Sequence, residues 1–412
     1  MWTRLIGASA AMVLIATSVM TTAGSQVASA ASAPYKIGFL ASETGAYATA
    51  FTGSLQGAEA RIALANAQGG VDGHKLTLVS IDDTSSPTGV VTAVQNAVQN
   101  QGVNILATTS YLTAVVAPYL HAQGLPVVGG NYDGPEWGTQ PYTNMFGSFG
   151  PMSPNDPVYT TFGLYMKQLG ATKIGCVAND IPTAISDCQS ALKGSVHLGL
   201  TNQYLDTTAS NTQTTFNSIA LNIKNSGANG LIMNYGPQQN AALLLDLAQD
   251  GYHPKALLLP SSYGQDFLST PALVQAVRET GALLGSYFVP VQLQTKGTKS
   301  FQAALKKYEH ITVTPSFQNY EGYTAVDMAI TALKAGGKTP TKSSMIKAMQ
   351  TTVKGDTLSG LSPSPLSWPL SKFGTGPVAL GANGCNYALR IVNGKYVPLN
   401  TKPTCGTEVS SS

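Results

Sequence analysis

Hydroxyl and aromatic side chains gather in one short turn, Thr108-Thr109-Ser110-Tyr111. The turn follows an apolar run of strand length, Val103 to Ala107, and precedes an apolar-periodic segment, Val115 to His121, that is typical of a helix. Hydroxyl groups and the N–H groups at a helix start suit a carboxylate or another hydrogen-bond acceptor. Thr109 or Ser110 is also expected to cap the helix, and capping does not compete with ligand contact.

The residues around this turn predict the sheet that positions it. Gly124 ends the helix as a left-handed cap, and Leu125 to Val128 is a second buried strand. A strand, a helix and a strand in this order indicate a parallel sheet with a right-handed crossover. Ligands bind such sheets beyond the carboxyl ends of the strands, where the turn lies.

The same pattern repeats through the first half of the chain. Strands are expected at Tyr35 to Leu40 and at Lys75 to Ile81, where Asp82-Asp83 ends the second, and Pro87 begins the next helix. Since these strands are parallel, their following loops share one edge of the sheet. We therefore expect three loops to face one place: 41–47, 108–111 and 131–134.

The second half repeats the pattern, with strands at Lys173 to Ala178, Gly230 to Met233 and Ala256 to Leu259. Polar loops follow each strand, at 179–183, 234–238 and 260–264. A polar stretch, 201–213, precedes a helix expected at 214–225, and another helix is expected at 158–169. Residues 386–399 predict a closing hairpin turned by Asn393-Gly394.

Irregular, proline-rich segments divide these repeats at 149–157 and 363–377, and a third division is expected at 285–291. The fold predicted is α/β, with two doubly wound parallel-sheet lobes joined by three crossings. The N-terminal lobe would comprise 35–150 and 290–363, and the C-terminal lobe 151–289 and 364–412.

Composition argues against several classes of partner. Apolar residues make up 43% of the 412 residues, charged residues make up 10%, and the formal net charge is +3. Because this charge is small and no basic run occurs, we expect no nucleic-acid or anionic-membrane partner.

Residues 1–30 are interpreted as a signal peptide that exports the chain to a periplasmic or secreted location. Leu5 to Met20 forms a weak apolar core, and Ala28-Ser29-Ala30 has the form of a cleavage site. Cleavage is expected after Ala30, with Ala33 as the alternative. A membrane span is the rival interpretation, but the run is short and poorly apolar. No cysteine precedes Cys176, so we expect no lipid anchor, and we expect a monomer.

The cysteines fit export. Cys176 lies close to Cys188 in the sequence, and Cys385 lies close to Cys405. Two local disulfides are the simplest of the three possible connectivities. A zinc site is the alternative, but no CxxC pair and no nearby histidine supports it.

The sequence lacks the motifs of common catalytic and cofactor sites. No GxSxG, GxxxxGK[ST] or HExxH occurs, and we expect no cofactor and no enzymatic activity. Asp82-Asp83 would suit Mg²⁺, although turn and helix-start hydrogen bonding is favoured. Glu43 and Asp133 would be a glycosidase pair only if their separation were suitable.

Several motifs in order make the chain similar to the periplasmic binding proteins of type 1 fold, within them to the leucine/isoleucine/valine-binding group that serves ABC importers. The resemblance covers about residues 35–400. It rests on these segments: Ile37-Gly38-Phe39-Leu40, Thr44-Gly45-Ala46-Tyr47, Gly57-Ala58-Glu59, Gly69-Gly70-Val71-Asp72-Gly73, Asp82-Asp83, Ala117-Pro118, Gly124-Leu125-Pro126-Val127 and Tyr320-Glu321-Gly322-Tyr323-Thr324-Ala325-Val326-Asp327.

The resemblance implies an extracytoplasmic solute-binding protein that closes around a small ligand by a hinge motion and then docks on membrane permease subunits. It places ligand contacts in loops of both lobes. The residues expected to bind are Tyr47, Thr109, Ser110, Tyr111, Asn131, Tyr132, Asp133, Tyr235, Gln238, Ser262 and Tyr263.

One departure from the family bears on the ligand. The carboxylate that meets the ammonium of amino-acid ligands falls here near Ser262 or Tyr263, where no acid stands. Because an unpaired buried ammonium is costly, we expect a polar or aromatic solute that is neutral, or a carboxylate without an ammonium. Asp133 or Glu43 as a relocated partner would restore an amino-acid ligand. A ligand-binding sensor component is a further alternative, because it would have the same fold.

Overall fold

The computed structural model describes residues 32–130, 134, 136–148, 157–374 and 384–409. The expected signal peptide and the expected ligand contacts Asn131, Tyr132 and Asp133 lie outside the described residues. Met1–Ser32 and Ala33–Ser412 form separate units, and the following account concerns the second. Among the described residues, no helix is both long enough and apolar enough to cross a bilayer.

The first sheet is parallel and has the strand order β2-β1-β3-β4-β5. Every side chain of β3 is buried, as is typical of a central parallel strand covered on both faces. The strands predicted from apolar runs are confirmed, and the sheet gains β5, which no prediction covered. The strands are β1 (Tyr35–Ala41), β2 (Leu76–Asp82), β3 (Ile105–Thr108), β4 (Val127–Gly129) and β5 (Met145–Gly147).

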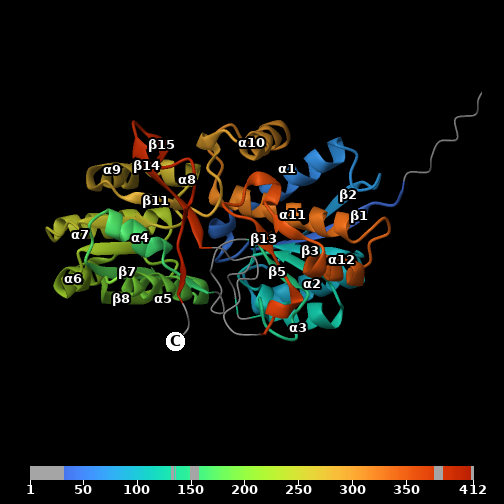
Figure 1. Ribbon diagram of the computed structural model, residues 1–412, viewed down its shortest axis with the longest axis horizontal. Coiled ribbons are helices and arrows are strands. Elements are labelled where there is room, and N and C mark those ends of the chain that lie inside the picture. The colour runs from blue at the N-terminus through green and yellow to red at the C-terminus, as the bar shows by residue number, and fades with distance from the viewer. Residues whose placement is uncertain (1–31, 131–133, 135, 149–156, 375–383, 410–412) are drawn as a thin grey trace, which may run out of the picture. The chain divides into compact units, whose positions relative to one another are not determined.

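Helices cover this sheet, and α2 begins at Pro87 as predicted, where the Ser86 hydroxyl accepts from the Gly89 N–H. Helix α11 packs against α1, β3 and β4 and is buried along almost its whole length (Figure 1). A Cβ at Gly322 would overlap the Ser54 carbonyl, so glycine permits this close approach. The helices are α1 (Ser54–Ala67), α2 (Pro87–Gln99), α3 (Thr113–Ala122), α11 (Phe317–Ala335) and α12 (Lys342–Thr351).

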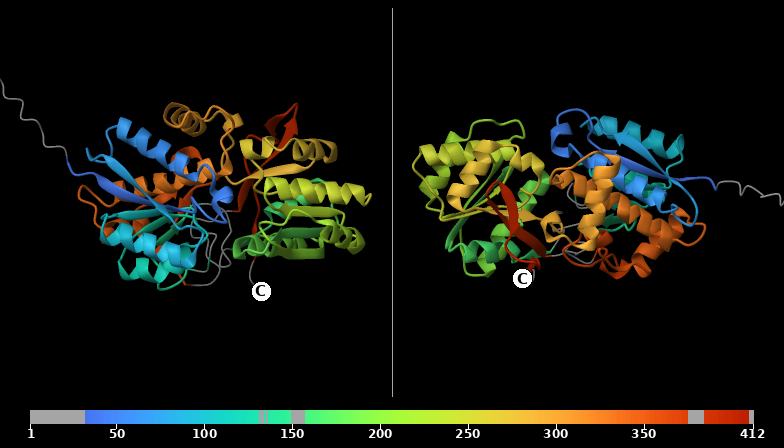
Figure 2. Two further views of the ribbon diagram at one scale, coloured as in Figure 1. Left: turned by 180° about the vertical axis from the view of Figure 1, so that it is seen from behind. Right: turned by 90° about the horizontal axis from the view of Figure 1, so that it is seen from above.

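The second sheet is mostly parallel and has the order β15-β14-β11-β10-β9-β7-β8. Strand β14 runs antiparallel to β11, and the predicted β14–β15 hairpin is confirmed at the sheet edge (red in Figure 2). The strands are β7 (Lys173–Asn179), β8 (Thr201–Ala209), β9 (Gly230–Asn234), β10 (Ala256–Leu259), β11 (Leu283–Ser286), β14 (Cys385–Val392) and β15 (Lys395–Pro398).

Two strands of this sheet were not predicted. The first nine residues of the polar stretch 201–213 form β8, which pairs with β7. Strand β8 is an edge strand with mostly exposed or half-buried side chains, so it tolerates a polar composition. Because of that composition the sequence did not predict a strand here. The other is β11, whose last two residues lie in the segment 285–291 that was expected to be a crossing.

The remaining elements surround the second sheet or connect the chain. The helix expected at 158–169 begins only at Thr161, because Val158–Tyr159 pairs with Glu408–Val409. These elements are α4 (Thr161–Gln168), α5 (Pro182–His197), α6 (Asn217–Ser226), α7 (Pro237–Gln249), α8 (Gln265–Leu268), α9 (Pro271–Thr280), α10 (Lys296–Tyr308), β6 (Val158–Tyr159), β12 (Lys354–Asp356), β13 (Leu366–Ser367), β16 (Thr404–Cys405), β17 (Glu408–Val409) and the 3₁₀ turns η1 (Ala48–Phe51), η2 (Val291–Leu293), η3 (Leu358–Gly360) and η4 (Leu370–Lys372).

Both predicted disulfides are present. Cys176–Cys188 joins β7 to α5, with the two Cα atoms 5.6 Å apart. Cys385–Cys405 joins β14 to β16, with the two Cα atoms 4.0 Å apart. Each disulfide therefore ties together elements at the second sheet that are close in sequence.

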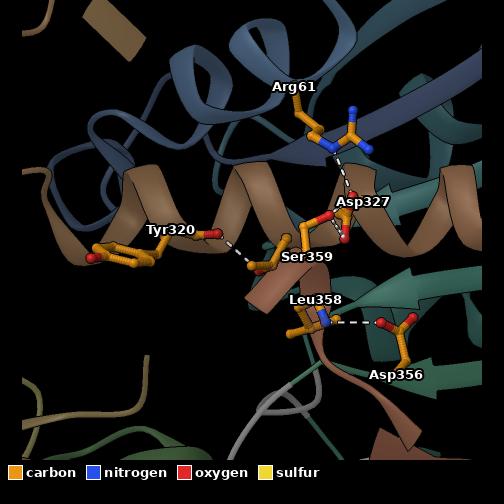
Figure 3. A network of polar contacts seen from close by, with 7 residues as sticks. Arg61, Tyr320, Asp327, Asp356, Leu358 and Ser359 are labelled. Carbon is orange, nitrogen blue, oxygen red and sulfur yellow. Dashed lines mark hydrogen bonds and ion pairs between the residues drawn. The ribbon is translucent and has the colours of Figure 1, made fainter. Parts of the chain in front are cut away.

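A buried ion pair joins α1 to α11. The Arg61 Nε lies 2.7 Å from Asp327 Oδ1, and both side chains are almost fully buried. The Ser359 hydroxyl, from η3, contacts both carboxylate oxygens of Asp327 at 2.9 Å (Figure 3). This network holds three segments that are far apart in the sequence.

Candidate functional site

A buried carboxylate, Asp83, organises the strand-end edge of the first sheet. The Ser42 hydroxyl donates to its Oδ2 across 2.9 Å, and the Ser110 hydroxyl donates to the same oxygen. The Ser85 N–H donates to Oδ1 across 2.7 Å. The Ser110 hydroxyl also accepts from the Leu112 N–H, which leads into α3. Ser110 is therefore fixed in position just before α3. The expectation that Thr109 or Ser110 caps the helix is wrong, because the N-cap residue is Leu112 and no side chain caps α3.

Aromatic rings lie beside these hydroxyls. The Tyr111 ring makes edge contacts with Phe51, at 4.6 Å between centroids, and with Tyr47, at 5.6 Å. Burial raises the pKa of Tyr111 above its ordinary value, with smaller contributions from the charges of Glu321 and Tyr47. The Tyr111 hydroxyl is thus protonated at neutral pH, and the cluster offers rings and a phenol next to Thr109 and Ser110.

Glu321, on α11, adds an acid that no prediction assigned to this edge. Its side chain is 2% exposed, and its Oε2 has no hydrogen-bond partner among the described residues. Burial raises the pKa of Glu321 well above its ordinary value, and a hydrogen bond from Gln318 opposes the rise. The sequence signal for Glu321 was weak, because the same helix also carries Asp327, Lys334 and two amide side chains.

At the second sheet, Tyr235 follows the carboxyl end of β9. Its ring packs on Phe216 with centroids 5.2 Å apart, and its hydroxyl is buried with no hydrogen-bond partner among the described residues. Gln238, in the first turn of α7, is exposed. Of these two predicted contacts, Tyr235 thus presents a buried polar atom without a partner among the described residues, whereas Gln238 is exposed.

Tyr263 and Ser262 follow β10 but are held inside the protein. The Tyr263 ring is 2% exposed, and its hydroxyl accepts from the Val291 N–H at 2.9 Å and donates to Gln292 at 2.8 Å. The carbonyl of Ser262 accepts from the Tyr396 hydroxyl at 3.2 Å. In this arrangement Tyr263 supports the η2 segment, and a ligand role for it stays a prediction.

The second sheet has its own buried acid, Asp187, in the second turn of α5. Its Oδ2 accepts from the Asn234 amide at 2.9 Å, and the Tyr287 hydroxyl lies at 3.5 Å. Burial raises the pKa of Asp187 to about 7, against hydrogen bonds from Tyr287 and Asn234 that lower it. The sequence spacing indicates that Asp187 is buried, because it lies on the same helix face as the buried Ala184 and Cys188.

The alternative acids of the first sheet are engaged with their neighbours. Asp82 accepts from the Thr44 hydroxyl at 2.6 Å and from the N–H groups of Glu43 and Thr84. Burial raises its pKa, but these hydrogen bonds outweigh burial and lower it overall. The exposed Glu43 carboxylate accepts from the Ser80 hydroxyl. Within the described residues no cluster of three or more His, Cys, Asp or Glu side chains is suited to hold a metal ion.

The predicted contacts therefore form two groups. Tyr47, Thr109, Ser110 and Tyr111 lie together at the first sheet, and Tyr235 lies at the strand-end edge of the second sheet. The family model of periplasmic binding proteins matches residues 34–363, and the chain belongs to that family.

Solved structures share this fold across most of the chain. A branched-chain amino acid ABC transporter protein from Thermus thermophilus with bound valine is 16% identical, with a TM-score of 0.74, covering 90% of this chain and 97% of its own. A solute-binding protein from Rhodopseudomonas palustris HaA2 with p-hydroxybenzoic acid is 18% identical, with a TM-score of 0.71 and coverages of 91% and 97%.

A third structure is the fatty acid ABC transporter substrate-binding protein from Thermomonospora curvata, 18% identical, with a TM-score of 0.70 and coverages of 90% and 92%. A search of curated protein sequences gives no match. The solved structures confirm the predicted α/β fold, and the match of the family model confirms the predicted family of periplasmic binding proteins.

Proposed function

We propose that the chain is the extracytoplasmic solute-binding component of an ABC importer and delivers a small polar or aromatic organic solute to membrane permease subunits. Family membership supports the binding role, and the three structures above are named as parts of ABC transporters. The observation that carries the proposal is the cluster of Tyr47, Phe51 and Tyr111 beside Ser110, at the carboxyl ends of parallel strands.

Capture would use two lobes that close around the solute by a hinge motion. The N-terminal lobe would comprise 35–150 and 290–363, and the C-terminal lobe 151–289 and 364–412. Each lobe would contribute the strand-end residues predicted from the sequence. Thr109, Ser110, Tyr47 and Tyr111 would contact one side of the solute, and Tyr235 the other.

The chemistry of the first edge favours a solute with a flat ring or an acceptor group. Tyrosine and phenylalanine rings pack on planar or apolar surfaces. Hydroxyls and backbone N–H groups at the start of α3 suit an acceptor. The solutes named for the three structures differ in kind, so the solute of this chain must be measured.

The proposal also includes the location and the assembly state. The chain would be exported by the segment 1–30, cleaved after Ala30 and function as a monomer in a periplasm-like space. Its closed, solute-bound form would be the one that contacts the permease subunits, because the importer must distinguish loaded from empty protein.

A thermal-shift screen of the purified mature chain tests this function. Amino acids, amines, aromatic acids, amides and sugars would each be added in excess. A solute present at about 100 times its dissociation constant stabilises the folded state by about 2.7 kcal/mol, which is a measurable shift. We expect at least one small organic class to give such a shift with one-to-one stoichiometry. A folded protein that responds to none of these classes contradicts the proposal.

A further inference from the structure

A small cavity lies beside Asp187 and is not one of the predicted contacts. Its volume is about 30 Å³, enough for one or two water-sized groups. Rings and polar side chains line it together with the Gly384–Asn386 backbone. The lining side chains that matter here are Tyr159, Phe162, Asp187, Ser190, Tyr287 and Asn386.

The cavity is formed at the strand-end edge of the second sheet. Asn234, the bonding partner of Asp187, is the last residue of β9, and Tyr287 directly follows β11. Asn386 is the second residue of β14, which pairs antiparallel with β11. Because Tyr235 follows Asn234 in the chain, the cavity lies at the same edge as a predicted ligand contact.

Asn386 supplies the observation that points to a ligand. The residue is 2% exposed, yet neither its Oδ1 nor its Nδ2 has a hydrogen-bond partner among the described residues. Its backbone is engaged, since Asn386 pairs with Thr404 of β16 and its backbone carbonyl accepts from the Tyr165 hydroxyl at 2.7 Å. Buried amide groups are normally paired, so an unpaired amide lining a cavity is expected to bind what enters it.

The charges of the residues around the cavity decide which chemical group of a ligand would bind there. Asp187 is the acid of the cavity, Tyr159 and Tyr287 are the other titratable side chains that line it, and its described lining contains no Lys, Arg or His. A carboxylate ligand would therefore meet a carboxyl group with no cation to offset it. An ammonium group would gain a charge-assisted hydrogen bond and aromatic neighbours, both of which favour cations.

We infer that this cavity receives the amino group of the transported solute, with the Asp187 carboxylate and the side-chain Oδ1 of Asn386 accepting its hydrogen bonds. The inference rests on the proposed solute-binding function and names the class of solute as a primary amine or amino acid. It revises the expectation of a ligand without an ammonium, because the acid missing near Ser262 and Tyr263 is supplied from α5.

The pH dependence of binding follows from the same site. Burial holds the pKa of Asp187 at about 7, so the carboxyl must ionise to pair with an ammonium. Below that pH the affinity for an amine is expected to fall about tenfold for each pH unit. The affinity for a neutral or acidic analogue would not fall in this way.

Calorimetric titration with matched compounds tests the inference. The pairs are benzylamine with benzyl alcohol, L-leucine with 4-methylpentanoate, and L-tyrosine with 3-(4-hydroxyphenyl)propanoate. In at least one pair we expect the amino compound to bind about 100-fold more tightly or more, as befits a hydrogen-bonded charge in a buried site. Asp187→Asn and Asn386→Leu should weaken that binding, the former by at least about 30-fold, whereas the exposed control Asp180→Asn should not change it.

The outcomes separate the two proposals. Equal binding of amino and des-amino compounds, undiminished binding by Asp187→Asn, or binding of no amine at all overturns the assignment of the cavity. Binding of a neutral or acidic solute in the same titrations would then preserve the solute-binding function. Circular dichroism spectra like those of the original protein would show that a loss of binding in either variant is not a loss of fold.

Discussion

The side-chain amide of Asn234 donates to Asp187 Oδ2 across 2.9 Å and so joins the last residue of β9 to the second turn of α5. The Tyr287 hydroxyl, just beyond β11, lies 3.5 Å from the same oxygen. The carboxyl group is thus held by side chains from two strand ends. A carboxyl held this way is oriented before any ligand arrives, which reduces the entropy that binding must overcome.

The stability of the solute-free protein should depend on the ionisation of Asp187. Its pKa is raised to about 7 by burial, from an ordinary value of 3.8, so the folded state holds the proton more tightly than the unfolded state. Stability from this group is therefore full below about pH 4 and is lost as the pH rises to about 7, by roughly 4 kcal/mol at most. Urea unfolding of the original protein and Asp187→Asn across this range measures the difference.

Asp187→Asn should remove that loss. As the pH rises, the free energy of unfolding of this variant should therefore increase relative to that of the original protein. The exposed control Asp180→Asn should follow the original protein. Parallel pH profiles for Asp187→Asn and the original protein would show that this carboxyl has an ordinary pKa.

The aromatic cluster at the first sheet should contribute to solute affinity. Tyr111→Ala removes the ring that contacts both Phe51 and Tyr47, and we expect it to raise the dissociation constant by about 10-fold or more, as for buried aromatic anchors. The control Tyr119→Ala removes a half-buried tyrosine from α3 that bonds Gln99 instead. Calorimetry measures the solute affinity of both variants. An equal loss of affinity in the two would contradict this prediction and mean that Tyr111 affects binding through folding alone.

The Cys176–Cys188 disulfide should stabilise the fold by closing a short loop. The half-cystines are 12 residues apart and fully buried. In the chain-entropy description, a loop of this size contributes about 3 kcal/mol. Replacing both residues by alanine should lower the midpoint of urea unfolding accordingly, and adding a reductant should have no further effect through this pair. An unchanged midpoint would mean that the loop is ordered without the bond.

The Arg61–Asp327 pair should be costly to break. Asp327→Ala leaves the Arg61 guanidinium buried without its partner, and we expect a loss of about 3–5 kcal/mol of unfolding free energy. Ser359→Ala removes only the hydroxyl that bonds the same carboxylate and should cost about 1–3 kcal/mol. A similar small loss in both variants would indicate that solvent reaches the pair.

Much of the framework was readable from the sequence because strong local signals agreed with it. Apolar runs marked β1 and β3, Pro87 marked the start of α2, and Asn393-Gly394 marked the closing hairpin. Strand β8 was not predicted, because an exposed edge strand needs no alternation of apolar side chains.

The candidate site was harder to predict, since it depends on contacts between distant segments. The hydroxyl of Tyr263 forms hydrogen bonds with Val291 and Gln292, and no local sequence pattern near Tyr263 indicates these bonds. Asp187 lies on a helix face, whereas the predicted contacts were sought in the loops after strands. Only the fold brings it next to Asn386, about 200 residues further along the chain, at an edge that parallel strands share.

Native mass spectrometry of the mature protein purified from its producing cells tests the central claim most directly. A solute-binding protein with a micromolar or tighter site is expected to retain part of its solute through gentle purification. We predict a one-to-one complex with a small organic molecule that is released on denaturation and that, when added back, raises the unfolding temperature. A protein that is folded, carries no small molecule and is stabilised by none of the screened solutes would contradict the account.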